Sequence, residues 1–181
     1  MNTDQFIQAI RKTKAQLLAQ RQSDAILIGK ESLALVRRRI QNTGEDSFGS
    51  DFEGYSDNPL PPFFFIGKSV NASGENRVRR AQKEGTGLSY KEFRQANNRR
   101  TDIVDLTFTG AMWREMDVFI QSNENTSTTV SIKPRTERSR KVAAFNSERY
   151  GNILRMSKNE ISTIRKANLD RVLKIFQSNL K

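Results

Sequence analysis

The sequence contains no histidine and no cysteine, and these two absences exclude most of the common catalytic centres. The chain can form no Ser-His-Asp triad, no cysteine nucleophile and no zinc site of the usual kinds. A catalytic centre would have to use carboxylates, lysine, serine, threonine or tyrosine, with or without Mg²⁺. The lack of cysteine also excludes a disulfide framework, which fits a reducing compartment. We therefore expect a protein that is not an enzyme and that uses no cofactor, metal or small-molecule substrate.

Long hydrophobic runs are also missing from the chain. No apolar stretch approaches the ~20 residues that a membrane helix needs. The first residues, Met1–Gln5, lack the basic-then-apolar layout of a signal peptide. Hydrophobic residues make up 35% of the chain, which supports one modest core with much solvated or partner-facing surface. We expect a single domain over residues 1–181 and no membrane partner.

Basic residues are in clear excess over acidic ones. Thirty-one lysines and arginines against twenty acids give a net charge of +11, and the isoelectric point is near 10.3. This balance attracts polyanions, nucleic acid first, although an acidic protein partner would also satisfy it. Three of the arginines, Arg37–Arg39, also suit the negative C-terminal end of a helix, which is a purely structural explanation.

Apolar spacing predicts helices at both ends of the chain. Residues 3–20 form one helix, and Ser23 with Asp24 caps a second that runs to about Gln41. Gly29 falls on the apolar face of that second helix, so either another backbone packs closely there or the pattern is imperfect. At the other end, the capping box of residues 157–160 opens the last helix.

The middle of the chain alternates irregular and regular segments. Residues 42–60 read as an acidic loop, and residues 63–66 as a buried strand or a docking hook. Residues 70–87 read as a mobile arm or extended loop, followed by a short helix over residues 88–98. We therefore expect a loop or arm insertion at about residues 42–87.

Strand signals follow this insertion. The β-branched and aromatic residues of 103–109 give the strongest single-strand pattern in the chain. Residues 116–121 and 128–133 predict a hairpin, in which Val118 and Ile120 face Val130 and Ile132. The order of helices, loops, short strands and a final helix predicts an α+β fold with a small antiparallel sheet.

An acidic and a basic segment lie on opposite sides of the phenylalanine run. Residues 42–60 carry five acids and no lysine or arginine, whereas residues 77–100 carry eight basic and two acidic side chains. Separated opposite charges suit a head-to-tail ring, because each copy presents one segment to its neighbour's other. At least one of the three consecutive phenylalanines should meet another element or another subunit. The candidate interface residues are Glu45, Asp51, Glu53, Phe63, Phe64, Phe65, Arg79, Arg80 and Arg94.

Two other functions compete with a ring subunit. Tyr90 and Phe93 interleave with basic side chains, a pattern that binds single-stranded nucleic acid by charge and stacking, so a non-catalytic nucleic-acid-binding protein is the main alternative. The third hypothesis is a Mg²⁺-dependent nuclease built on Asp46, Asp51 and Glu53, although no carboxylate-to-lysine spacing supports it.

Three segments carry a resemblance to a known family. Residues 44–56 read Gly-Glu-Asp-Ser-Phe-Gly-Ser-Asp-Phe-Glu-Gly-Tyr-Ser, and residues 106–113 read Leu-Thr-Phe-Thr-Gly-Ala-Met-Trp. Residues 149–160 read Arg-Tyr-Gly-Asn-Ile-Leu-Arg-Met-Ser-Lys-Asn-Glu. In this order they resemble the G-x-D-x-x-G-x-x-W/F-x-x-L/Y-S, L-x-x-T-G-x-L/M and R-x-F-L-G-x-S-x-x-E patterns of tail-completion ("virion morphogenesis") proteins of tailed bacteriophages.

The resemblance implies a structural virion protein without catalytic residues. Such a protein is a neck or tail-completion subunit that sits at the head–tail junction and joins the head connector to the tail. It implies a homo-oligomeric ring around the DNA channel, with the connector and the tail terminator or tube as protein partners and DNA passing through. It also implies synthesis in the cytoplasm of the bacterial host.

Overall fold

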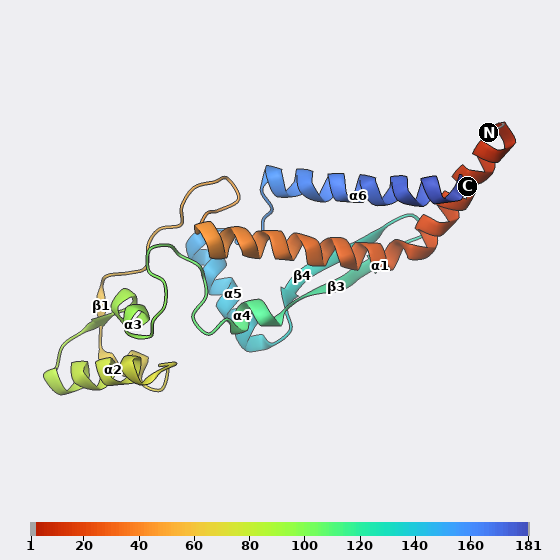
Figure 1. The fold of residues 1–181 in the computed structure, drawn as a ribbon. Helices are drawn as coiled ribbons and strands as arrows, with labels where there is room; N and C mark the ends of the chain where they lie inside the picture. Colours follow the sequence, from red (N-terminus) through yellow and green to blue (C-terminus); the bar gives the residue numbers. More distant parts are fainter. Residues whose placement is uncertain (1–2, 181) are drawn as a thin grey trace.

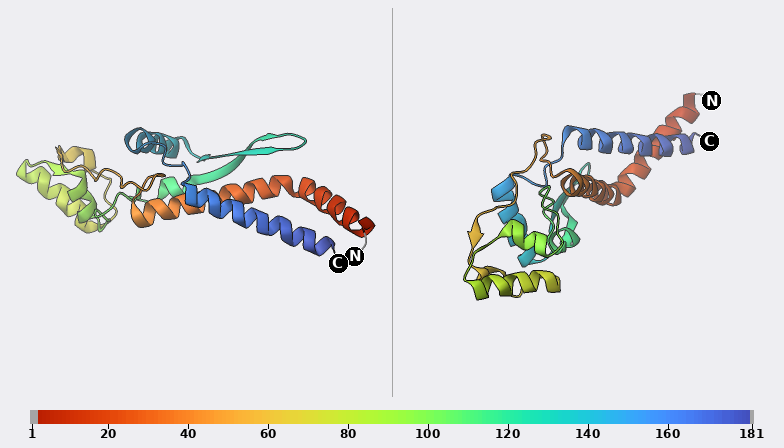
Figure 2. Two further views of the ribbon diagram at one scale, coloured as in Figure 1. Left: turned by 90° about the horizontal axis from the view of Figure 1, so that it is seen from above. Right: turned by 60° about the vertical axis from the view of Figure 1, so that its left-hand side comes forward.

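A single helix of 41 residues, α1 (Thr3–Thr43), forms the axis of the computed structural model, which describes residues 3–180. The C-terminal helix α6 (Lys158–Asn179) packs along it in the opposite direction, so both ends of the described chain lie at the same end of the molecule (Figures 1 and 2). The Phe6 and Phe176 rings meet edge to face there, with centroids 5.8 Å apart.

The predicted break before Ser23 is wrong. Ser23 lies inside α1, where its hydroxyl donates to the carbonyl of Gln20 at 2.7 Å instead of capping a new helix. A serine and an aspartate have only modestly lower helix propensity than their neighbours, and no proline or glycine stands beside them to stop the preceding helix. The two predicted helices are therefore one.

The hairpin is confirmed, and it packs against α1. Strands β3 (Met116–Asn123) and β4 (Thr128–Pro134) pair antiparallel, and the four residues predicted to face one another do so, with Val118 opposite Ile132 and Ile120 opposite Val130. A Cβ on Gly29 would lie 2.6 Å from Cγ1 of Val118, so the close neighbour of Gly29 is a side chain of β3 and not a backbone. The glycine lets the hairpin approach the helix.

Two short helices flank the hairpin. Helix α4 (Ala111–Glu115) leads into β3, and α5 (Glu137–Tyr150) follows β4. Thr136 caps α5 by accepting a hydrogen bond from the backbone of Ser139. The main hydrophobic cluster joins α1, α4, the start of β3 and the loop after α5: Val36, Ile40, Met112, Trp113, Met116 and Ile153.

Residues 59–98 form a separate lobe, which we call the arm. Strand β1 (Pro59–Leu60) pairs with β2 (Leu88–Ser89), and the 3₁₀ helix η1 (Pro62–Phe65), α2 (Ala72–Glu84) and α3 (Tyr90–Ala96) complete it. The arm lies at the end of the molecule opposite the termini (Figure 1). It has its own buried cluster: Phe65, Val78, Ala81, Leu88 and Phe93. The short helix predicted over residues 88–98 is confirmed as α3.

Two predictions for the middle of the chain are wrong, and of the two alternatives for residues 63–66 the strand is excluded while the docking hook stays a prediction. Residues 70–87 are not an extended loop, because Asn71 caps α2 by accepting from the backbone of Gly74, and Gly85 ends it at φ +65°. Residues 63–66 do not form a strand, because most of them belong to η1. Residues 103–109 do not form a strand either, and Leu106 has φ +50°, which no regular strand allows. The acidic residues 42–60 are irregular up to β1, as predicted.

The predicted fold class is confirmed as α+β, with a long N-terminal helix, two small antiparallel two-stranded sheets and a C-terminal helix packed on the first.

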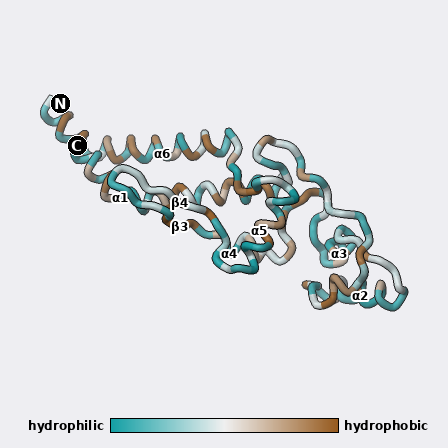
Figure 3. The backbone as a smooth tube through the Cα atoms, turned by 180° about the vertical axis from the view of Figure 1, so that it is seen from behind, coloured by the Kyte–Doolittle hydropathy of each residue, from teal (hydrophilic) through white to brown (hydrophobic). Residues whose placement is uncertain are grey.

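Helix α6 carries hydrophobic and hydrophilic residues in alternation along its length, as Figure 3 shows. The capping box is also confirmed, since Ser157 accepts from the backbone of Glu160, whose carboxylate accepts from the backbone of Ser157.

We expect Ser157→Ala to lower the free energy of unfolding by about 1 kcal/mol, because it removes the side-chain acceptor of the capping box. Chemical denaturation measures the loss. Ser178→Ala is the matched control, because Ser178 lies at the other end of α6 and only donates to the carbonyl of Ile175. Equal losses for the two variants would contradict a capping role.

Candidate functional site

The acidic loop is a closed turn and not an open metal site. The backbone N–H of Asp46 donates to Ser50 O at 2.8 Å, and that of Phe52 donates to Gly44 O at 2.9 Å. The Asp46 carboxylate accepts from the backbone N–H groups of Phe48 and Ser50, and the hydrogen bond from Ser50 is the largest cause of its lowered pKa. Within residues 3–180, no three acidic side chains gather closely enough to hold a metal ion. The nuclease hypothesis therefore lacks the cluster on which it depended.

The three acidic interface candidates lie on this loop. Glu45 and Asp51 pair across the turn through a single β-bridge, and Asp51 and Glu53 are exposed. None of the three forms an ion pair with a described lysine or arginine. The charges of Asp51 and Glu53 therefore face solvent and are available to a partner, whereas Glu45 is half-buried.

The three phenylalanines divide between core and surface. Phe65 is buried and stacks on Phe93, with ring centroids 4.6 Å apart. Phe63 and Phe64 are 62% and 45% exposed and stack on each other at 4.4 Å. We call these two rings the aromatic pair. Ile66, the next residue after η1, is exposed as well. Exposed apolar side chains that lie together mark binding sites in many proteins, so the aromatic pair is a candidate contact for a partner.

The basic interface candidates also divide. Arg79 and Arg80 are exposed on α2, where each pairs with a glutamate four residues away: Arg79 with Glu75 at 2.5 Å and Arg80 with Glu84 at 2.7 Å. Arg94 on α3 is only 1% exposed and cannot contribute to a surface. The interface hypothesis therefore keeps Arg79 and Arg80 and loses Arg94.

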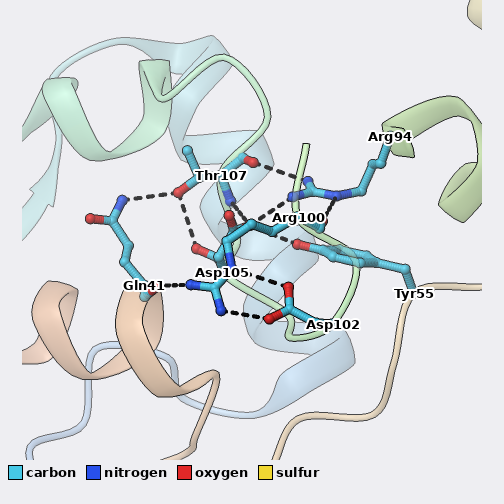
Figure 4. Close-up of polar contacts among 7 residues, drawn as sticks. All are labelled: Gln41, Tyr55, Arg94, Arg100, Asp102, Asp105 and Thr107. Carbon is cyan, nitrogen blue, oxygen red and sulfur yellow. Dashed lines mark hydrogen bonds and ion pairs between the residues drawn. The ribbon is translucent and has the colours of Figure 1, made fainter. Parts of the chain in front are cut away.

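Arg94 instead organises a buried joint between the arm and the rest of the molecule (Figure 4). Its guanidinium donates to the carbonyls of Arg100 at 2.9 Å and Thr107 at 3.0 Å, and to Oδ1 of Asp105 at 2.9 Å. It also lies 4.0 Å from the centroid of the Tyr55 ring, a cation–π contact. Each nitrogen of the guanidinium thus donates to an acceptor inside the chain.

Asp105 is the acceptor at the centre of this joint. Oδ1 also accepts from the Tyr55 hydroxyl and from the backbone N–H of Thr107, both at 2.9 Å. Burial raises the pKa of Tyr55 above its usual range. Thr107 Oγ1 accepts from Gln41 of α1 at 2.9 Å, so the network reaches the main helix (Figure 4). The joint therefore connects α1, the acidic loop, α3 and the 99–110 segment.

The same network explains why residues 103–109 are not a strand. Leu106 takes a left-handed conformation so that the backbone folds around the Asp105 carboxylate. At the surface of the joint, Arg100 pairs with Asp102 at 2.7 Å, and the hydrogen bond from Arg100 lowers the pKa of Asp102 to about 2. The one sequence signal that pointed to this joint is Asp105, an aspartate in the middle of the apolar β-pattern of residues 103–109.

In comparisons with family models, curated proteins and solved structures, no match to this chain was found. Among residues 3–180, no helix has the length and apolar content needed to cross a membrane.

Proposed function

We propose that this chain is a structural virion protein of a tailed bacteriophage, a neck or tail-completion subunit that joins the head connector to the tail as part of a homo-oligomeric ring. The observation that carries the proposal is that the three family-like segments, far apart in sequence, meet in one hydrophobic cluster. Phe52 comes from the first segment, Met112 and Trp113 from the second and Ile153 from the third.

Further contacts join the first and third segments directly. The Phe52 and Tyr150 rings lie 5.3 Å apart, and the Arg155 guanidinium lies 4.6 Å from the centroid of the exposed Phe48 ring. Arg39 of α1 donates to the carbonyls of Glu45 and Arg155 and pairs with Glu160 at 2.9 Å. The acidic loop is therefore fixed to the start of α6, which supports a rigid surface for contact with neighbouring subunits.

The size of the surface supports an assembled state. The accessible surface is 11965 Å², whereas a compact monomer of this mass has about 8,900 Å². The difference, roughly 3,000 Å², is comparable to the area that a subunit buries against two neighbours at about 800 Å² or more each. Large apolar side chains left exposed on the two long helices contribute to this excess: Phe6, Ile7, Ile10, Leu18, Leu27, Ile161, Leu169, Val172 and Leu173.

Ring formation through the charged segments gives a direct test. Reversing the unpaired acids by Glu45→Lys, Asp51→Lys and Glu53→Lys should abolish closed rings of the purified protein, as measured by mass photometry and electron microscopy. Reversing Arg79→Glu and Arg80→Glu should do the same, and mixing the two variants should partly restore rings. Exposed pairs contribute only ~0.2–1 kcal/mol each, so charge sets the register while apolar contacts hold the interface.

A matched control reverses three exposed acids away from the loop, by Glu124→Lys, Glu148→Lys and Asp170→Lys. This control changes the net charge equally and should leave ring formation intact. If the variant with the three reversed loop acids forms rings as well as the wild type does, charge pairing between subunits does not set the register of the ring. A wild type that stays monomeric when concentrated and when mixed with connector particles would overturn the ring itself.

A further inference from the structure

A basic groove runs between α1 and the start of the hairpin. Lys30 and Arg37 lie seven positions apart and therefore project from one face of α1, and Arg38 also lines the groove. Arg114 of α4 adds a fourth cation from the other wall. The groove has a volume of about 540 Å³. Its remaining lining is apolar or neutral: Leu33, Ala34, Gln41, Asn42, Trp113 and Met116. No acidic residue lines it.

The four cations have no carboxylate partner in the described chain. Arg38 makes no hydrogen bond or ion pair there, and Arg37 donates only to the amide oxygen of Gln41 at 3.0 Å. Arg114 donates to the carbonyl of Thr109 at 2.8 Å. Lys30 forms no ion pair, although its charge is one of the smaller causes of the lowered pKa of Asp117, which is itself paired with Arg135. Like charges gathered without counter-ions repel one another and attract an anion.

The helix dipole does not account for this cluster. The favourable effect of a helix C-terminus on cations falls off within the last turn. Helix α1 continues to Thr43, and its last turn contains no basic residue. Lys30, Arg37 and Arg38 therefore lie too far from the end of the helix for the dipole to explain their positions, and the structural explanation suggested by the sequence is insufficient.

Trp113 supplies a second, independent observation in the wall of the same groove. The side chain is 2% exposed, and its indole Nε1–H has no acceptor within the described residues. A buried donor left without an acceptor costs about 1–3 kcal/mol. The groove thus has a buried, unsatisfied N–H donor in one of its wall residues, and a small movement of the indole or an ordered water could give this donor an acceptor when an anion binds.

We propose that this groove binds the phosphate backbone of DNA. Lys30 and Arg38 are separated by eight residues, or about 12 Å along the helix at 1.5 Å per residue. Phosphates follow one another every ~3.4 Å of helix axis along a DNA strand, so a row of this length spans three to four steps. A linear row of cations matches a polyanion, whereas a single free anion would occupy only part of it. This inference rests on the groove and does not depend on the ring.

Trp113 is the only tryptophan in the chain, so its fluorescence reports on the groove alone. The test measures binding of a short DNA duplex to the full-length protein by anisotropy of the labelled DNA and by Trp113 emission, over a series of salt concentrations. The groove variant combines Lys30→Gln, Arg37→Gln and Arg38→Gln. The matched control combines Arg165→Gln, Lys166→Gln and Lys174→Gln, three exposed cations of α6 without ion-pair partners in the described chain. Thermal unfolding verifies that both variants fold.

Loss of three phosphate contacts should reduce the slope of log affinity against log salt by about 2.7 and weaken binding at least about tenfold near 0.1 M salt. The Trp113 emission change should vanish in the groove variant and persist in the control, whose slope should change by less than about one. Equal losses of DNA affinity in the groove variant and the control variant would overturn the proposal, and so would absence of DNA binding by the wild type. An identical emission change with inorganic phosphate at matched ionic strength would also overturn it, since it would indicate a site for a free anion.

Discussion

Replacing Arg94 by methionine should lower the free energy of unfolding by about 3–5 kcal/mol, because the buried Asp105 carboxylate loses its counter-ion. The two carbonyls of Arg100 and Thr107 lose their donors at the same time. Methionine keeps an unbranched apolar stem in place of the arginine stem, so the loss reports mainly on charge and hydrogen bonding. Urea unfolding followed by Trp113 fluorescence measures it.

Arg80→Met is the matched control for this experiment. Arg80 pairs with Glu84 at 2.7 Å on the exposed face of α2, where solvent screens the ion pair, so the same substitution there should cost much less than at Arg94. Adding Asp105→Leu to Arg94→Met should recover part of the loss, because no uncompensated buried charge then remains. Equal costs at the two arginines would show that the joint does not stabilise the fold.

Substituting Gly29 by leucine should be the next most damaging change, at about 3 kcal/mol, the upper end of the range for overpacking. The first added atom alone would approach Val118 Cγ1 to 2.6 Å. Val118 is buried and β-branched, so it has few rotamers with which to yield. Leucine has higher helix propensity than glycine by up to ~1 kcal/mol, and we expect the clash to exceed that gain. Denaturant unfolding measures the net effect.

Two further variants separate the clash from other causes. Gly54→Leu places the same side chain at a glycine with nothing within 4 Å of the added atom and an ordinary φ, and it should be nearly neutral. Val118→Ala combined with Gly29→Leu should be more stable than the sum of the two single changes predicts, because the smaller side chain makes room. Strict additivity of the two changes would contradict direct packing of β3 on α1.

The sequence predicted the parts of the fold that depend on local patterns. The hairpin register follows from alternating apolar residues, and the start of α6 follows from the Ser157–Glu160 capping box. Helix α2 was missed because its signals are an Asn cap and a terminal Gly around few apolar residues, Val78 and Ala81. The same Gly and Asn are also typical of loops, so only packing against Phe93 and Leu88 distinguishes a helix from a loop here.

The candidate site was predictable only in part, for a physical reason. Exposure of Glu53, Phe63 and Arg79 agrees with the surface role that their sequence context suggested. Burial of Arg94 could not be foreseen, because a charged side chain enters the interior only when distant partners satisfy it, and these come from Tyr55 and residues 100–107. The basic groove could not be predicted from the sequence either, because Trp113 and Arg114 come close to Lys30 only through tertiary packing.

The pairing of α1 with α6 has a consequence for synthesis in the cell. Helix α1 is made well before Phe176, whose ring meets Phe6. At roughly 5–20 residues per second, α1 waits on the order of ten to thirty seconds for its partner helix. Its apolar residues are uncovered during that interval, so the nascent chain should be a substrate for ribosome-associated chaperones until α6 has been made.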